Sequence, residues 1–188
     1  MREALQRDEL VLEYQPQVAL ATGRIVAAEA LVRWRHPRHG LLAPGSFIPI
    51  AEQTGLILPL GAWILRAACA EAARWAGDVR VSVNLSPIQL RQRRLVDEVA
   101  EALHATGLAA DRLELEVTES ILLKDTEQVL VVLEGLKELG VHIAMDDFGT
   151  GYSSLGYLQR FPFDKLKIDR CFVRDLFVSS GSAAIIRA

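Results

Sequence analysis

Two acidic side chains, Asp146 and Asp147, stand next to each other between an apolar segment and a Phe-Gly-Thr-Gly turn. At the end of a buried strand, two neighbouring negative charges repel each other and need a positive partner. Glu29, Asn84 and Glu116 lie in strand-like segments elsewhere in the chain. Carboxylate and amide oxygens are the ligands that hard divalent cations such as Mg²⁺, Mn²⁺ and Ca²⁺ prefer. Gathered in one place, these side chains would form a metal site.

The elements that must bring these residues together follow the pattern of an α/β protein. Six segments have the composition and alternation of strands, at residues 9–18, 25–34, 79–86, 112–119, 141–147 and 163–169. Three segments of helical period lie between them, at residues 58–76, 89–107 and 126–140. Only Ala-Thr-Gly-Arg separates the first two strands, which predicts an antiparallel hairpin. The later βα units predict parallel strands with helices outside, as in a (β/α) barrel.

Alternation along each strand decides which side chains face the centre of such a barrel, because successive residues point to opposite faces. The apolar Leu113, Leu115 and Val117 oppose Glu114 and Glu116, and the other strands divide in the same way. If the apolar faces meet the helices, one polar set points inward near the carboxyl ends of the strands, where barrels of this kind place their active sites. That inward set is Glu29, Asn84, Glu116, Asp146 and Lys167.

Divalent ions beside Asp146 would account for the adjacent charges, and Asp147, already in the turn, can take a second ion or hold a metal-bound water. Paired ions stabilise the attacking and leaving oxygens of a phosphoryl displacement. Lys167 and Arg33 add fixed positive charge where phosphate oxygens would lie. The alternative is that the inward carboxylates form structural ion pairs with Lys165, Lys167 and Arg33, without a metal.

The composition limits the remaining functional classes. A chain of 188 residues, 51% of them hydrophobic, is long enough for one core and predicts a single domain. A net charge of −3 with scattered basic residues argues against a nucleic-acid polymer as partner. The two cysteines, Cys69 and Cys171, lie far apart without close histidine or cysteine companions, which indicates a reducing compartment. No signal peptide or membrane segment is recognisable, so we expect a cytoplasmic protein.

Seven segments resemble, in order and spacing, the EAL-domain family of cyclic di-GMP phosphodiesterases: AEALVRWRHP, FIPIAEQTGLI, LGAWIL, VSVNLSP, LELEVTES, MDDFGTGYSSLGYL and FDKLKID. The resemblance covers nearly the whole chain, and residues 1–188 are assigned to one EAL domain. It implies a modified TIM barrel whose first strand is antiparallel. It also implies hydrolysis of cyclic di-GMP to linear pGpG with Mg²⁺ or Mn²⁺, and inhibition by Ca²⁺.

The same resemblance implies roles for individual residues. It makes Glu29, Asn84, Glu116 and Asp146 metal ligands, and Asp147 a ligand of a second metal.

Lys167 would position the attacking water, and Arg33 would contact a ligand phosphate. Gln15, the Leu31 backbone and Asp169 are expected to bind the dinucleotide. Glu119 is similar to the glutamate that anchors the DDFGTGYSS loop, which the family uses for dimerisation and control of activity, so we expect a homodimer through this region.

The end of the chain departs from the family pattern, which continues past Ser-Ala-Ala-Ile-Ile-Arg-Ala with two more strands. One of them carries the glutamate regarded as the general base, and the next carries a glutamine near the active site. The sequence therefore predicts a barrel truncated before its last two strands, and its unpaired edges favour association with another chain. The alternative function is a non-catalytic cyclic di-GMP receptor or regulatory module. The resemblance also allows fused sensory or GGDEF domains outside residues 1–188.

Overall fold

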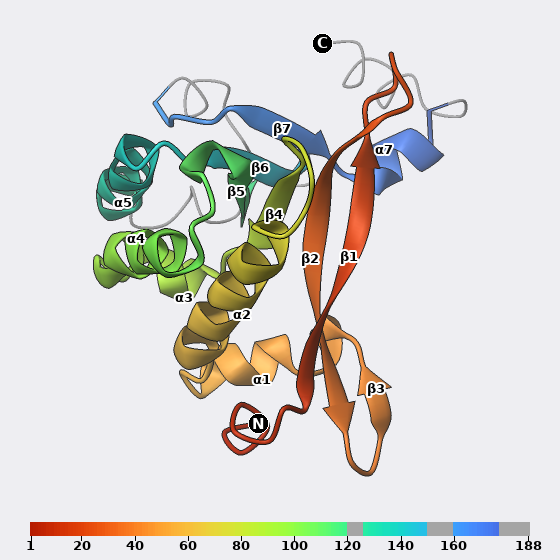
Figure 1. The fold of residues 1–188 in the computed structure, drawn as a ribbon, viewed down its shortest axis with the longest axis vertical. Coiled ribbons are helices and arrows are strands. Elements are labelled where there is room, and N and C mark those ends of the chain that lie inside the picture. Colours follow the sequence, from red (N-terminus) through yellow and green to blue (C-terminus); the bar gives the residue numbers. More distant parts are fainter. Residues whose placement is uncertain (120–125, 150–159, 177–188) are drawn as a thin grey trace.

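One sheet organises the computed structural model, which describes residues 1–119, 126–149 and 160–176 (Figure 1). Its path runs in the order β1-β2-β4-β5-β6-β7, and β3 pairs with β2 alone. The strands are β1 (Leu10–Val18), β2 (Ile25–His36), β3 (Gly40–Leu42), β4 (Arg80–Asn84), β5 (Leu113–Thr118), β6 (His142–Phe148) and β7 (Lys165–Ile168). All six predicted strands are therefore present, and β3 is a short addition that the sequence pattern did not indicate.

The strand directions agree with the prediction of a barrel with an antiparallel first strand. β1 and β2 form an antiparallel hairpin in which Gln15 faces Glu29. β2, β4, β5, β6 and β7 then run parallel to one another. Across the interior, Lys165 Nζ on β7 donates a hydrogen bond of 2.7 Å to Gln17 Oε1 on β1. The sheet therefore curls until its two ends lie within side-chain reach, although no backbone ladder joins β1 to β7 in the described residues.

Helices cover the outer face of the sheet, where α2, α4 and α5 lie side by side (Figure 1). The helices are η1 (Pro44–Ser46), α1 (Ile48–Gln53), α2 (Ile57–Ala72), α3 (Pro87–Leu90), α4 (Arg94–Thr106), η2 (Ala110–Arg112), α5 (Thr126–Glu138) and α7 (Arg170–Arg174). The expected single helix at 89–107 is wrong, because the chain forms α3 and α4 there. Ser86 and Gln89 build a capping box that starts α3 earlier, with Pro87 at its first position.

The core lies between the sheet and these helices. Leu113, Leu115 and Val117 of β5 are buried, and so are Ile143 and Met145 of β6. Burying each such side chain contributes about 1.5 to 3 kcal/mol. The predicted division into an apolar outer face and a polar inner face is therefore confirmed for β5 and β6, whereas Leu166 and Ile168 on the predicted apolar face of β7 are exposed. No helix of the described residues has the length and apolar character needed to cross a lipid bilayer.

Candidate active site

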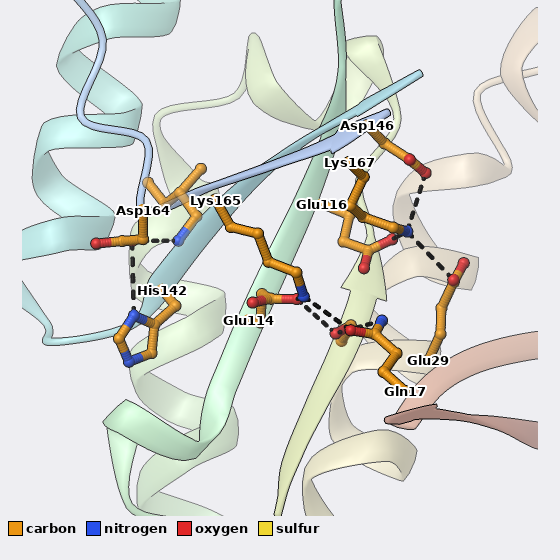
Figure 2. A network of polar contacts seen from close by, with 11 residues as sticks. Gln17, Glu29, Glu114, Glu116, His142, Asp146, Asp164, Lys165 and Lys167 are labelled. Atoms are coloured by element: carbon orange, nitrogen blue, oxygen red, sulfur yellow. Dashed lines mark hydrogen bonds and ion pairs between the residues drawn. The ribbon is translucent and has the colours of Figure 1, made fainter. Parts of the chain in front are cut away.

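The ammonium group of Lys167 lies at the centre of a cluster of carboxylates inside the curved sheet (Figure 2). Lys167 Nζ is 3.2 Å from Glu29 Oε2 and 3.2 Å from Asp146 Oδ2. It is 2.5 Å from Glu116 Oε2, a short charge-assisted hydrogen bond. Three carboxylates from three separate strands thus share one cation.

Strand register explains why these residues meet. Asn84 at the end of β4 is in register with Glu116 on β5, and its side chain lies beside Glu29 of β2. Asn84 Nδ2 donates a hydrogen bond of 2.7 Å to Glu29 Oε1. The five inward residues predicted from alternation, Glu29, Asn84, Glu116, Asp146 and Lys167, are therefore brought together at one place.

Burial dominates the electrostatics of the cluster. Glu116 is 1% exposed, and burial raises the pKa of its carboxyl group to about 7 despite the neighbouring Lys167, which lowers it. The charges of Glu29 and Asp146 raise the same pKa further. Burial also lowers the pKa of Lys167, but the attraction of Glu116, Glu29 and Asp146 outweighs this effect and raises it. The site therefore favours the charged form of Lys167 and, by burial, the protonated form of Glu116.

The donor set fits a hard divalent cation, although Lys167 stands where the ion would bind. Glu116 Oε1 is buried and has no hydrogen-bond partner among the described residues, so one carboxylate oxygen is left for another ligand. Within these same ranges, no three acidic, histidine or cysteine side chains are already gathered closely enough to hold a metal ion. A metal would therefore require Lys167 Nζ to withdraw from the carboxylates, while Glu29, Glu116 and Asp146 close around the ion.

Asp147 takes a different direction from Asp146. Its φ of 55° lies in the left-handed region, and its backbone N–H donates a 3.0 Å hydrogen bond to Asp146 Oδ1. Burial raises the pKa of Asp147, and Asp146 and a hydrogen bond with Asp169 raise it further. Asp169 also caps α7 by accepting from Cys171 N–H at 2.8 Å. The adjacent charges are therefore separated, with Asp146 facing Lys167 and Asp147 facing Asp169.

Glu119 lies directly after β5 and is 2% exposed. Its Oε2 accepts a hydrogen bond of 2.9 Å from the backbone N–H of Gly149, at the start of the Gly-Thr-Gly segment. This contact has the geometry expected for an anchor of the DDFGTGYSS loop. Residues 150–154 of that loop lie outside the described residues, and with them most of the region expected to form a dimer.

A cavity of about 500 Å³ opens next to Asn84. Leu31, predicted to bind the ligand, lines it, and most of the other lining residues are apolar. Glu52, Ser86 and Gln89 also line it, and sequence reasoning missed them; Ser86 Oγ donates a 2.7 Å hydrogen bond to Glu52 Oε1. The capping-box signature of Ser86 and Gln89 could have located this polar edge from the sequence.

Gln15 and Arg33 lie outside the residues that line this cavity. Gln15 is exposed on β1, in register with Glu29. Arg33 Nε forms a 2.8 Å ion pair with Glu13 Oε2 of the neighbouring strand. The alternative in which Arg33 pairs with the inward carboxylates is therefore not the arrangement of the structure.

Comparisons with known proteins all indicate the same family. A family model described as EAL domain matches residues 1–188. The chain is 50% identical over 192 residues to the cyclic di-GMP phosphodiesterase NbdA of Pseudomonas aeruginosa, covering 100% of this chain and 24% of that protein. It is 48% identical over 192 residues to the bifunctional diguanylate cyclase/cyclic di-GMP phosphodiesterase MucR of the same species, covering 100% and 28%. The chain thus spans about a quarter of the length of these curated relatives.

Solved structures show the same fold. A complex of the Pseudomonas aeruginosa MucR phosphodiesterase with c-di-GMP superposes with a TM-score of 0.93 at 49% identity, covering 98% of this chain and 76% of that chain. The EAL enzyme Bd1971, bound to cAMP and cyclic di-GMP, superposes with a TM-score of 0.90 at 34% identity, covering 98% and 52%.

Proposed function

The chain belongs to the EAL domain family, and from this premise we propose that it is a metal-dependent phosphodiesterase that hydrolyses cyclic di-GMP to linear pGpG. The observation that carries the proposal is the convergence of Glu29, Glu116 and Asp146 on one point, with Asn84 beside them. The similarity to NbdA and to the c-di-GMP complex of MucR supports the choice of substrate.

In this proposal the chain's own residues bind the substrate and hold charge at the reacting phosphate. The cavity beside Asn84, with its apolar walls and the polar edge of Glu52 and Ser86, takes part of the dinucleotide. Leu31 lines the same cavity, and Gln15 and Asp169 complete the ligand contacts that we propose. Arg33 contacts a ligand phosphate after exchanging its ion pair with Glu13.

Glu29, Asn84, Glu116 and Asp146 would hold Mg²⁺ or Mn²⁺, and Asp147 a second ion. Bound there, the metal supplies Lewis-acid stabilisation of the phosphoryl oxygens and lowers the pKa of the attacking water. Lys167, with its ammonium moved off the carboxylates, would provide a positive charge and a hydrogen-bond donor at the attacking side. Glu119 holds the turn after β6 through Gly149 and so keeps the loop next to the acidic residues.

A second candidate function is a cyclic di-GMP receptor without turnover. The observation that favours it is the position of Lys167, whose ammonium forms ion pairs with all three carboxylates at the point where the proposed metal would bind. A protein kept in this state would still offer the cavity beside Asn84 to the ligand. Binding would then serve regulation of a partner and not hydrolysis.

One experiment separates the two functions. The purified chain is incubated with cyclic di-GMP and Mn²⁺, and pGpG is measured by chromatography. The phosphodiesterase predicts product that is lost in Glu29→Ala, because a carboxylate ligand is removed. Glu71→Ala is the matched control, since Glu71 lies on α2 and pairs with Arg74. Ligand binding in Ca²⁺ without any pGpG in Mn²⁺ would favour the receptor.

Three broader features belong to the same proposal. We propose that the domain works in the cytoplasm, where cyclic di-GMP signalling takes place. We further propose a homodimer through the DDFGTGYSS region and fused sensory or GGDEF domains in the longer protein. The share of about a quarter of NbdA and MucR that the chain matches supports a multidomain context.

A further inference from the structure

A second ion pair lies in the interior, one layer below the carboxylate cluster (Figure 2). Lys165 Nζ is 2.7 Å from Glu114 Oε1 and 2.7 Å from Gln17 Oε1. Ser82 Oγ donates a further hydrogen bond of 2.8 Å to Glu114 Oε1. The side chain of Glu114 is 1% exposed, so its charge is held by these groups and not by water.

The two ion pairs lie parallel to each other and join the same two strands, like rungs of a ladder. Glu114–Lys165 is the lower rung and Glu116–Lys167 is the upper rung. Glu114 and Glu116 are two residues apart on β5, and Lys165 and Lys167 are two residues apart on β7. Both rungs pass over β6, which lies between those strands. At that level β6 carries Ala144, which is in register with Glu116 on one side and Lys165 on the other. Its methyl group is small enough to let both lysines reach across.

β7 needs support from side-chain ion pairs because its backbone pairing with β6 is weak at Lys167. The strand has four residues, and its register with β6 shifts between Met145 and Phe148. Lys165 and Leu166 have regular partners on β6, whereas Lys167 lies at the shift and has no register partner among the described residues of β6. The backbone ladder therefore does not fix Lys167 by itself.

We propose that Glu114 and Lys165 are positioning residues, whose ion pair holds β7 against β5 so that the ammonium of Lys167 lies among Glu29, Glu116 and Asp146. Among the described residues, neither Glu114 nor Lys165 lines the cavity, and their hydrogen bonds go to each other, Gln17 and Ser82 and not to the carboxylate cluster. The pair acts through the strand, by fixing the residue two positions before Lys167. The effect of this ion pair on hydrolysis rests on the proposed function, but its effect on the position of Lys167 does not.

The test removes the lower rung without leaving a buried charge. Lys165→Met alone would leave the buried Glu114 carboxylate without its cation and would destabilise the fold. The double variant Glu114→Gln/Lys165→Met keeps both side-chain volumes, and the amide oxygen that it introduces at position 114 can still accept from Ser82 Oγ. Its unfolding transition is measured first, to show that the protein is folded.

The position of Lys167 is then measured without metal or substrate. Proteins are acetylated briefly at amines, and the rate at each lysine is read by mass spectrometry. We expect Lys167 to react about tenfold faster in the double variant, because its ion pairs with the carboxylates loosen. The α-amino group of Met1 is the internal control, since the N-terminus lies far from β7 in the fold (Figure 1). Lys137, whose 2.7 Å ion pair is with Asp164 next to Lys165, reports whether the start of β7 loosens as well. An unchanged rate at Lys167 in a folded double variant would overturn the proposal.

A second measurement uses Mn²⁺ alone, by calorimetric titration of four proteins: the unchanged chain, the double variant, Lys167→Met, and all three substitutions together. Lys167→Met should bind Mn²⁺ more tightly, because the ion no longer competes with the ammonium for the carboxylates. Losing the Glu114–Lys165 pair should lower the Mn²⁺ dissociation constant about tenfold, towards that of Lys167→Met. In the Lys167→Met background it should change nothing further, since the residue it positions is gone. Equal effects in both backgrounds would assign the rung a purely structural role and overturn the proposal.

The rate of cyclic di-GMP hydrolysis shows whether the ion pair affects catalysis. The cavity is lined from β2, η1, α1, α2, β4 and α3 and by Thr118, with no described residue of β7 among them. The double variant should therefore lower kcat by about tenfold to a hundredfold while KM stays within about twofold. If the unchanged chain forms no pGpG, the proposed function fails, whereas the acetylation rates still decide the position of Lys167.

Discussion

At the scale of single residues, Glu116 carries the largest electrostatic cost of the site. Its carboxyl group is almost fully buried, one of its oxygens has no partner among the described residues, and the other is paired with Lys167. A buried carboxylate of this kind favours its protonated form, which explains a pKa of about 7. Glu116 is therefore the residue at which protons and the proposed metal ion would compete.

The stability of the metal-free protein should fall as pH rises from about 5 to about 7 and should level off above that. The pKa of Glu116 is about 7 in the folded protein against an ordinary value of 4.5, so the folded state binds the proton more strongly in this window. Its contribution is complete below the lower pKa and is lost above the higher one. The difference is on the order of 3 kcal/mol. Urea unfolding between pH 5 and pH 8, with a chelator present, measures it.

The variant Glu116→Gln supplies the control for this titration. Glutamine keeps the shape of the side chain but cannot ionise, so the free energy of unfolding should lose most of its slope between pH 5 and pH 8. A slope of the same size in Glu116→Gln would assign the pH dependence to another group, for which Asp147, with its raised pKa, is the next candidate.

At the scale of elements, the small side chain of Ala144 on β6 lets the charged side chains of β5 and β7 meet above it. Ala144 is fully buried between the two ion-pair rungs. Ala144→Leu should push the lysines away from Glu114 and Glu116 and destabilise the fold by about 1 to 3 kcal/mol. Faster acetylation of Lys167 would accompany the loss. Ala144→Ser is the matched control, and equal behaviour of the two variants would contradict the steric explanation.

The contact between α2 and α3 sets the wall of the cavity. A Cβ atom at Gly61 would overlap the side-chain amide of Gln89, whose Oε1 accepts a 3.1 Å hydrogen bond from Ser86 N–H. We expect Gly61→Ala to cost about 1 to 3 kcal/mol, and Gln89→Ala to remove most of that cost by opening the space. Urea unfolding of the four proteins of this cycle measures the coupling. Simple additivity would show that the two residues do not meet.

The elements also show where sequence reasoning succeeds. Period-two alternation sorted β5 and β6 into apolar and polar faces correctly, because burial of one face leaves little freedom of register. The same reasoning joined 89–107 into one helix, since helical period alone does not reveal the stop after Leu90. The short elements β3 and α1 carry too few residues for a periodic signal.

At the scale of the whole molecule, the curvature of the sheet decides which charged side chains form ion pairs with one another. The alternation pattern of a single sequence does not give this curvature. Alternation placed Lys165, Lys167 and several carboxylates on one face, but it did not say which of them pair. Curling brings Lys165 to Gln17 and Glu114, and Lys167 to Glu29 across the interior. Arg33 shares the second strand with Glu29 yet pairs with Glu13, because β1 is its immediate neighbour.

The same curvature predicts that a bound metal stabilises the molecule as a whole. The proposed ligands come from β2, β4, β5 and β6, so an ion held by them links strands between residues 29 and 146. Mn²⁺ at one hundred times its dissociation constant should raise the free energy of unfolding by about 2.7 kcal/mol, and a chelator should reverse the gain. Unfolding is followed in urea by tryptophan fluorescence, since Trp63 and Trp75 pack against the core.

Glu29→Gln is the matched variant for this last experiment. It removes one anionic ligand, and glutamine can still accept the hydrogen bond from Asn84 Nδ2, so the metal-free fold should persist while the gain from Mn²⁺ falls to near zero. Glu71→Ala should keep the full gain, because Glu71 lies on α2, away from the cluster. An equal gain in all three proteins would place the Mn²⁺ elsewhere on the molecule and remove the metal centre from the inner face of the sheet.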